Sequence, residues 1–184
     1  ILASCQKEDG PAPETRTTVT LGAGNKTMPG SGTVTIAYND SPGSNSLEKL
    51  VDNNLISSFK TPRSAIDIVF QADKPFALQT YKIVSAVGNS KNDPAKWEFY
   101  ASADGESWTL IDSQDDETFS ARNLELAYDV RCQTEYSYYR MSILDNNGGE
   151  STDMAEMYLS DEDPDDIEHL IAKAKNFTKV SNTP

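Results

Sequence analysis

Acidic side chains are the groups best able to do chemistry in this sequence. The 184 residues include 29 Asp and Glu against 16 Lys and Arg, which gives a formal net charge of −13. A pair of carboxylates can hydrolyse a glycosidic bond, but acids are so frequent here that no pair stands out. The densest run, DEDPDDIE at 161–168, carries six acids in eight positions. We interpret this run as a solvated linker in preference to a metal site.

Nucleophiles and bases that serve most enzymes are scarce. The single histidine, His169, lies in the acidic C-terminal stretch. Cys132 therefore has no nearby imidazole to activate it. We expect Cys132 to be a small buried or edge residue and not a nucleophile. The sequence contains no His-Glu-x-x-His motif, no Gly-x-Ser-x-Gly motif and no phosphate-cradling loop. We expect a non-catalytic domain, and the acidic surface argues against nucleic acid as a partner.

Two tryptophans, Trp97 and Trp108, could form a ligand platform or belong to the core. In residues 97–102 (WEFYAS), apolar positions alternate with Glu98 and Ser102, which is the period of a half-buried strand. Residues 103–106 (ADGE) predict a tight turn, because Asp-Gly supplies the positive φ angles that a hairpin needs. Trp108 then begins the returning strand. We predict that both rings are largely buried.

The elements that must position these side chains are short and β-like. Turn-rich segments separate them, no helical pattern intervenes, and no apolar run is long enough to span a membrane. This spacing predicts an all-β antiparallel sandwich or barrel. The eight predicted strands are Thr33–Tyr38, Ala65–Gln71, Ala77–Ala86, Trp97–Ser102, Trp108–Asp112, Leu124–Val130, Tyr136–Ile143 and Met154–Leu159. A short C-terminal helix is predicted over 167–175, capped by Asp165 or Asp166.

The order of these segments resembles the coagulation factor V/VIII type C (discoidin, galactose-binding-like) domains. It is most similar to the version found in Bacteroidetes proteins, which is related to carbohydrate-binding module family 32. The resemblance covers residues 31–160 and implies an eight-stranded jelly-roll β-sandwich with both tryptophans in its framework. The residues that carry it are Asp93-Pro94, Trp97, Ser102-Ala103-Asp104-Gly105, Trp108, Phe119, Arg122, Tyr138-Tyr139-Arg140 and Asn146-Asn147-Gly148.

The resemblance implies a structural calcium ion. Family members hold it with an Asp carboxylate, backbone carbonyls, a hydroxyl and a Glu of the last strand, all oxygen ligands that Ca²⁺ prefers. The matching positions here are Asp52, Asn54, Ser57 and Glu156, with Ala155 offering a carbonyl. Asn53 stands where the family usually has Gly, and Phe59 where it has Trp. Glu156 also interrupts an apolar strand, and a buried carboxylate needs a partner. The alternative is that Glu156 faces solvent and residues 52–54 form only a turn.

The resemblance also implies a sugar-binding rim formed by the loops KTPRS, VGNSKNDP and DNNGGE. Sugar recognition needs planar polar groups and one exposed aromatic face. The polar groups would come from Arg63, Asn89, Lys91, Asn92 and Asn147, and the face from Phe59 or Tyr38. The chain departs from its relatives at Val87-Gly88, where they have Asn-Asp, and at Asn92, where they have Arg. Because of these departures, the alternative remains that the rim consists of ordinary polar loops and binds no sugar.

The first residues carry a targeting pattern. Leu2-Ala3-Ser4-Cys5 resembles the processing site of bacterial lipoproteins, which implies lipid on Cys5, and Lys7-Glu8-Asp9 resembles a Bacteroidetes surface-export signal. We therefore expect an outer-membrane lipoprotein facing outward, with a periplasm-facing protein as the alternative. The expected organisation is a disordered lipobox remnant and tether at 1–30, a β-sandwich at 31–160, and an acidic linker and helix at 161–184. The expected function is binding of a glycan or cell-surface polysaccharide, with a structural or spacer domain as the alternative.

Overall fold

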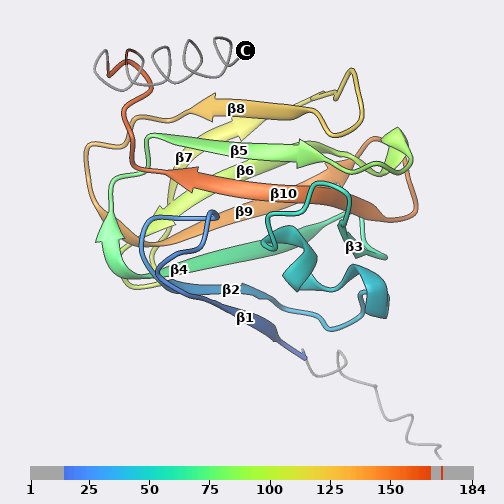
Figure 1. Cartoon of the computed structure of the whole chain (residues 1–184), viewed down its shortest axis with the longest axis horizontal. Coiled ribbons are helices and arrows are strands. Elements are labelled where there is room, and N and C mark those ends of the chain that lie inside the picture. Colours follow the sequence, from blue (N-terminus) through green and yellow to red (C-terminus); the bar gives the residue numbers. More distant parts are fainter. Residues whose placement is uncertain (1–14, 167–170, 172–184) are drawn as a thin grey trace, which may run out of the picture.

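Two antiparallel sheets, packed face to face, form the domain. The computed structural model describes residues 15–166 and Ile171. The larger sheet has the strand order β1-β2-β4-β9-β6-β7, and the smaller sheet, in front in Figure 1, has the order β3-β10-β5-β8. The strands are β1 (Thr17–Leu21), β2 (Gly32–Ile36), β3 (Phe59–Thr61), β4 (Ile66–Phe76), β5 (Thr80–Ser85), β6 (Pro94–Ser102), β7 (Thr109–Gln114), β8 (Glu125–Asp129), β9 (Tyr136–Asn146) and β10 (Thr152–Ser160). Short 3₁₀ helices are η1 (Gly43–Asn45), η2 (Leu47–Leu50) and η3 (Ser90–Asn92).

The predicted all-β sandwich is confirmed, and each of the eight predicted strands has a counterpart. The structure adds two short strands, β1 and β3, at the sheet edges. Strand β1 pairs with β2 along its whole length, from Thr17↔Ile36 to Leu21↔Gly32. The folded domain therefore starts near Thr17, so residues 17–30, predicted to belong to the tether, are part of the sandwich.

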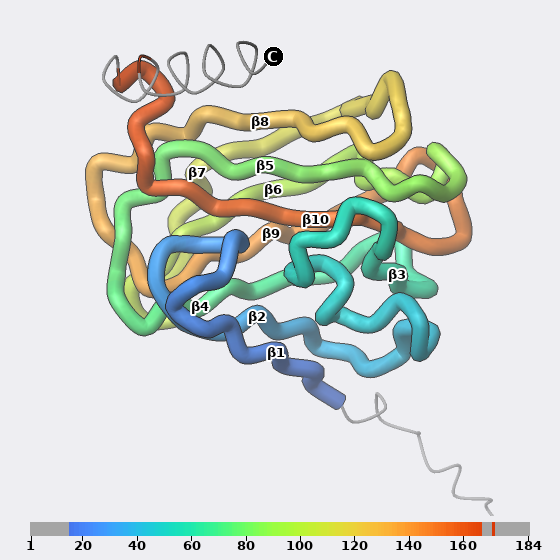
Figure 2. Tube along the Cα trace, in the orientation of Figure 1, coloured from blue at the N-terminus to red at the C-terminus, as the bar shows by residue number. Residues whose placement is uncertain are grey.

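The core lies between the sheets and follows the alternation along each strand. Ile66, Ile68 and Phe70 of β4 are buried, as are Tyr139 and Met141 of β9 and Met157 of β10. Figure 2 shows how the chain passes between the two sheets, so that segments distant in sequence meet at each end of the sandwich. These ends, and the outer faces of the sheets, are the places where loops and side chains can meet a ligand.

The two tryptophans occupy different faces of the larger sheet. Trp97 is fully buried, and its indole N–H donates to the Tyr81 hydroxyl at 2.8 Å. Trp108 was also predicted to be largely buried, and here the prediction is wrong. Its ring is partly exposed and stacks on the Arg140 guanidinium, 4.3 Å from Cζ to the ring centroid. The register of the hairpin accounts for this position, because Thr109 pairs with the buried Ala101 and the preceding Trp108 alternates to the other face.

Several predictions concern residues outside the described part of the chain. Cys5, the N-terminal part of the tether and nearly all of the predicted C-terminal helix belong to this group. Residues 161–166 of the acidic linker are described and run as irregular bends and turns. Among the described residues, no helix has the length and apolar character needed to cross a membrane.

Candidate functional site

The predicted sugar-binding residues all lie at one end of the sandwich, on the right in Figure 1. We call the loops there the rim loops: residues 37–42, 61–65, 86–93 and 146–151. They follow or precede strands of both sheets, because β2, β3, β5 and β9 end there and β4, β6 and β10 begin there. Loops held on such a scaffold can carry binding residues without disturbing the core.

Arg63 forms a cluster with Tyr38 and Asp40. Its Nε and Nη2 atoms each lie 2.7 Å from Asp40 Oδ2, and its Cζ lies 3.5 Å from the centroid of the Tyr38 ring. The guanidinium is thus held in one orientation by an ion pair and by stacking. Its Nη1 makes no hydrogen bond to the described residues, whereas Asp40 Oδ1, which also lacks a partner, is buried. A planar donor held in one orientation can bind the hydroxyl groups of a sugar.

Asn89, Lys91, Asn92 and Asn147 lie on two rim loops that hydrogen bonds join. Asn89 Oδ1 accepts from the backbone N–H of Lys91 at 3.1 Å and caps η3. Asn147 Nδ2 donates to Ser90 O at 3.3 Å, and Gly149 N–H donates to Lys91 O at 2.9 Å. The loops pack so closely that a Cβ on Gly149 would lie 2.8 Å from that carbonyl oxygen. Asn89, Lys91 and Asn147 are exposed and can meet a ligand, whereas Asn92 is partly buried.

Asp153 is a rim residue that the sequence analysis missed. It is buried, accepts a hydrogen bond from Asn92 Nδ2 at 3.1 Å, and lies 3.6 Å from Lys60 Nζ. Asn92 is therefore committed to an internal contact, which reduces what its amide can offer to a sugar. The missed signal was an acid at the start of an apolar strand, the same pattern that drew attention to Glu156.

An internal ion pair fixes the longest rim loop. Arg122 donates from Nη1 to Asp93 Oδ1 at 2.8 Å and from Nη2 to Asp93 Oδ2 at 2.5 Å. The same Nη1 also donates to Ala86 O at 3.2 Å, so one guanidinium holds both ends of the loop at 86–93. Because the Asp93 carboxylate is buried, removal of Arg122 would leave an unpaired charge, which costs about 3–5 kcal/mol.

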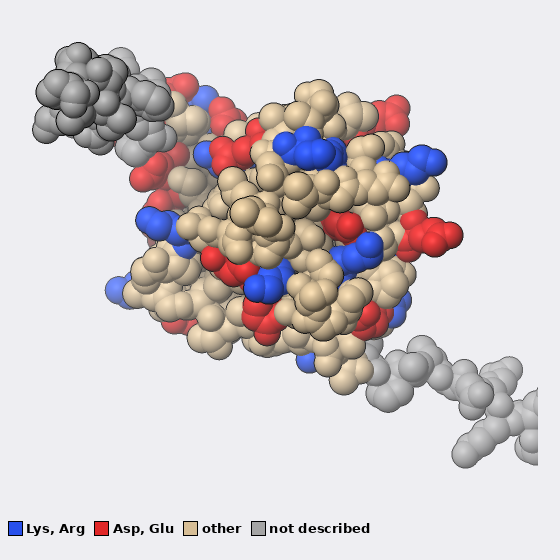
Figure 3. Space-filling view, turned by 45° about the vertical axis from the view of Figure 1, so that its right-hand side comes forward, with Lys and Arg blue, Asp and Glu red and all other residues tan. Residues whose placement is uncertain are grey.

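Of the two aromatic rings proposed for the rim, only Tyr38 remains. Phe59 is fully buried and cannot present a face to a ligand. Tyr38 is partly exposed, although Arg63 covers one side of its ring. Figure 3, which brings the rim side forward, shows basic and acidic side chains interspersed over the surface and no segregated patch of one sign. Such a surface suits a neutral, polyhydroxylated ligand better than a polyanion.

The predicted calcium ligands lie together in the structure. Asp52 Oδ1 and Glu156 Oε1 lie 3.0 and 2.8 Å from the same backbone nitrogen, that of Asn54. Since both oxygens are at hydrogen-bond distance from one atom, they are no more than about 6 Å apart. Ser57 Oγ lies 3.0 Å from Asp52 Oδ1, 2.9 Å from Asp52 Oδ2 and 3.0 Å from Asn54 O. A hydroxyl has one proton, so it can satisfy only one of these three acceptors.

Glu156 is the most constrained member of this group. It is fully buried, and its Oε2 has no hydrogen-bond partner. Burial, assisted by the nearby Asp52 carboxylate, raises the pKa of Glu156 to about 7. For Asp52 burial acts in the same direction, but hydrogen bonds from Lys49 and Ser57 outweigh it and lower its pKa. The Lys49 ammonium lies 3.0 Å from Asp52 Oδ2 and would compete with a bound cation.

The backbone around these side chains fits a cation as well. Ala155 lies between the pairs Met154↔Ser85 and Glu156↔Val84, where the register shifts, and such a bulge disrupts the hydrogen-bond ladder locally. Asn53 has φ 56°, a left-handed conformation in which Asn replaces the family's usual Gly at small cost. The described residues contain no group of three or more His, Cys, Asp or Glu placed to hold a metal. The ion would therefore depend on two carboxylates, a hydroxyl and carbonyls, a donor set that Ca²⁺ accepts.

Two of the solved structures with this architecture are family 32 carbohydrate-binding modules. A family 32 module from Clostridium perfringens, in complex with GalNAc-β-1,3-galactose, superposes with a TM-score of 0.56 at 12% identity over 78% of this chain and 94% of the other. The family 32 module of C. perfringens NanJ, in complex with galactose, superposes with a TM-score of 0.55 at 14% identity. The match covers 78% of this chain and 92% of the other. The chain has the discoidin-like, galactose-binding-like fold of family 32 carbohydrate-binding modules.

The same fold also occurs in the C-terminal domain of a chitobiase from Bacteroides fragilis. That domain has a TM-score of 0.52 at 18% identity over 82% of this chain and 95% of the other. No protein-family model and no curated protein matches the sequence. At these identities, the family 32 likeness establishes the fold, and function must be argued from the residues at the site.

Proposed function

We propose that this domain is a non-catalytic carbohydrate-binding or adhesion module that holds a glycan at its rim loops. The observation that carries the proposal is the Arg63 cluster, in which Asp40 and Tyr38 hold a guanidinium with a free donor face. Galactose and GalNAc-β-1,3-galactose are the sugars bound by two structures of the same fold. Galactose and N-acetylgalactosamine are therefore the first ligands to test.

A structural or spacer domain that binds no sugar is the second candidate. The observations that favour it are the exposed apolar Val87, at a position where relatives carry Asn, and the internal contact that occupies Asn92. The two candidates differ in whether the Arg63 cluster meets a ligand.

A glycan array separates them. Carbohydrate binding predicts a limited set of positive glycans for the wild-type chain and their loss in Arg63→Ala. The matched control is Lys74→Ala, which changes an exposed cation on β4, away from the rim loops. An array with no positive glycan, or with positives that survive Arg63→Ala, would favour the spacer.

The calcium site is part of the same proposal. Asp52, Asn54, Ser57, Ala155 and Glu156 would hold the ion, which would join the loop after η2 to the last strand. The buried, partnerless Glu156 Oε2 and the surplus of oxygens around Ser57 support this assignment. The ion would have a structural role, since these residues lie on a different loop from the Arg63 cluster.

We further propose that the domain belongs to a surface-exposed outer-membrane lipoprotein. The support is the Leu2-Ala3-Ser4-Cys5 pattern and the polar, Pro-bearing residues that follow it. A lipid on Cys5 would tether the module to the membrane.

A further inference from the structure

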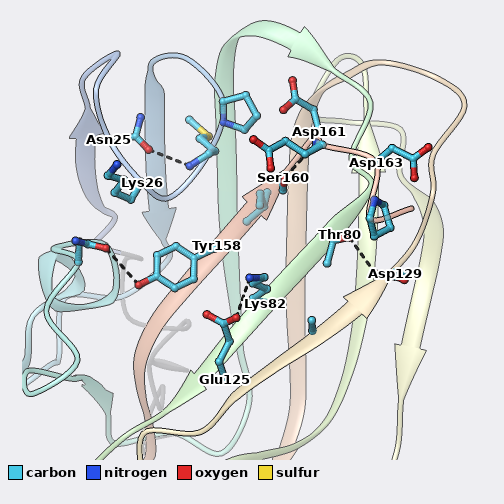
Figure 4. Close-up of a pocket in the computed structure, with 17 residues that line it drawn as sticks. Asn25, Lys26, Thr80, Lys82, Glu125, Asp129, Tyr158, Ser160, Asp161 and Asp163 are labelled. Atoms are coloured by element: carbon cyan, nitrogen blue, oxygen red, sulfur yellow. Dashed lines mark hydrogen bonds and ion pairs between the residues drawn. The ribbon is translucent and has the colours of Figure 1, made fainter. Parts of the chain in front are cut away.

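A hollow of about 630 Å³ lies on the outer face of the smaller sheet, beside β10, β5 and β8 (Figure 4). This volume is within the range of small-molecule sites. Its floor consists of two rows of paired residues, Tyr158↔Lys82↔Ala127 and Ser160↔Thr80↔Asp129. The hollow exists because Ala127, Thr80 and Ser160 are small, whereas Tyr158 beside them is large.

The first wall of the hollow is the loop at 25–29, which the structure holds firmly. Asn25 Nδ2 donates to Gly22 O and Gly30 O, both at 2.6 Å. Asn25 Oδ1 accepts from the backbone N–H groups of Thr27 and Met28, both at 2.9 Å. The loop is joined to the floor by the Leu159 N–H, which donates to Thr27 O at 2.6 Å. The wall is thus formed before any ligand arrives, which lowers the entropy cost of binding.

The second wall of the hollow is the segment at 161–164. The two walls and the floor together carry both acidic and basic side chains. Lys82 is paired with Glu125 at 2.8 Å, and Asp129 accepts from Thr80 Oγ1 at 3.0 Å. Lys26 is exposed on the first wall, and Asp161 and Asp163 are exposed on the second. The surplus of acids disfavours a polyanion, while the two lysines disfavour a strongly basic peptide. A neutral ligand with many hydroxyls can donate to the acids and accept from the ammonium groups.

Tyr158 supplies an apolar surface between these charges. Its ring lies at the edge of the hollow and is partly exposed, with its hydroxyl 3.5 Å from Asn53 Oδ1 (Figure 4). A neutral aromatic ring flanked by mixed polar groups is a suitable surface for the apolar face of a pyranose.

We propose that this hollow is a second carbohydrate-binding site, which takes a short neutral oligosaccharide. One sugar ring would lie against Tyr158, and its hydroxyls would reach Lys26, Asp161 and Asp163. The site is on the sheet face and shares no residue with the Arg63 cluster, so it does not depend on sugar binding at the rim loops. Two sites on one domain would strengthen attachment to a polysaccharide through multivalency.

The test is a ¹⁵N NMR titration of the full chain with cellotriose, chitotriose and GalNAc-β-1,3-galactose. Each oligosaccharide is added to about 10 mM, so that binding with a Kd near 1 mM is detected. We expect at least one probe to shift the amides of Lys82, Tyr158 and residues 25–29. Tyr158→Ala should weaken this binding at least about tenfold, whereas Tyr158→Phe should keep it within about twofold. Ala127→Leu, which fills the floor without touching Tyr158, should abolish it and guards against a folding defect in Tyr158→Ala.

Several outcomes would overturn the proposal. These are no shifts in the hollow with any probe, unchanged affinity in Ala127→Leu, or oligolysine binding there while the sugars do not. Arg63→Ala separates the two sites. Binding at the hollow that is unchanged in Arg63→Ala supports the second site, whether or not the wild-type rim loops bind a sugar.

Discussion

Glu156, on the last strand, accepts a hydrogen bond from the backbone N–H of Asn54, which lies 102 positions earlier in the chain. The contact joins the loop after η2 to the middle of β10 and brings a buried carboxylate against the Asp52 carboxylate. Two acids at such a place repel each other unless a proton or a cation lies with them. The arrangement therefore makes a direct prediction about metal-dependent stability.

Calcium is expected to stabilise the domain. At a free concentration about 100-fold above Kd, it should add about 2.7 kcal/mol, and Tm should rise by about 2–4 °C for each kcal/mol. Thermal unfolding in excess EDTA and then in Ca²⁺ would measure the change, and Mg²⁺ should have little effect because its geometry is stricter. Glu156→Gln should lose the response, whereas Lys49→Ala, which removes the competing ammonium, should keep or strengthen it. Equal midpoints in EDTA and Ca²⁺ would contradict the site.

Replacing the two tryptophans should have unequal effects on the free energy of unfolding. Trp97→Ala removes a fully buried ring and leaves the Tyr81 hydroxyl without its donor, so it should cost about 3–5 kcal/mol. Trp108→Ala removes a partly exposed ring that stacks on Arg140, and should cost about 1 kcal/mol. Urea unfolding of both variants measures the difference. Similar costs would mean that the outer-face position of Trp108 is wrong.

Asp104 should make stability fall in acid. Backbone hydrogen bonds from Ser107 and Glu106, together with Ser102, lower the pKa of Asp104 to about 2 from an ordinary 3.8. Because the folded pKa lies below the unfolded one, the stabilisation is present above about pH 4 and is lost as the pH falls toward 2. Asp104→Asn should therefore be less stable than wild type at pH 6, and this gap should close between pH 4 and 2. A gap that stays constant over that range would refute the prediction.

Cys5 is expected to carry the membrane anchor. In the full-length gene, Cys5→Ser should release the protein from the membrane fraction and remove its palmitate label, because a serine cannot be lipidated at this position. Fractionation and labelling of the two forms measure this. Cys132→Ser is the matched control, since that thiol lies near the end of the sandwich strands and should not affect the anchor. Membrane retention of the Cys5 variant without palmitate would contradict the prediction.

Much of the fold could be predicted because its signals are local. The alternation in Ile66-Asp67-Ile68-Val69-Phe70 and the Asp-Gly turn at 104–105 gave the positions of strands and a hairpin, and both are in the structure. Strand β3 was missed because its three residues are too few to show a period. Strand β1 was missed because Val19 and Leu21 lie among threonines in a stretch dominated by polar residues.

The remaining features depend on contacts that a linear pattern does not contain. A period of two identifies alternating positions, but the pairing of Thr109 with the buried Ala101 decides that Trp108 faces outward. Likewise, Phe59 was proposed for the rim by its position in the chain, and the packing of β3 against β10 buries it. The hollow beside Tyr158 forms only because the loop at 25–29 contacts β10. These two segments are close in space but lie near opposite ends of the sequence.

Sugar binding through Arg63 is the central claim, and calorimetry tests it most directly. Galactose and N-acetylgalactosamine would be titrated into wild type, Arg63→Ala and Arg63→Lys. The account predicts binding of at least one sugar with a Kd near or below about 1 mM, and at least a tenfold loss in Arg63→Ala. Arg63→Lys should also bind poorly, because an ammonium cannot reproduce the planar donor pair. Equal affinities in wild type and Arg63→Ala, or no binding of either sugar by the wild-type chain, would contradict it.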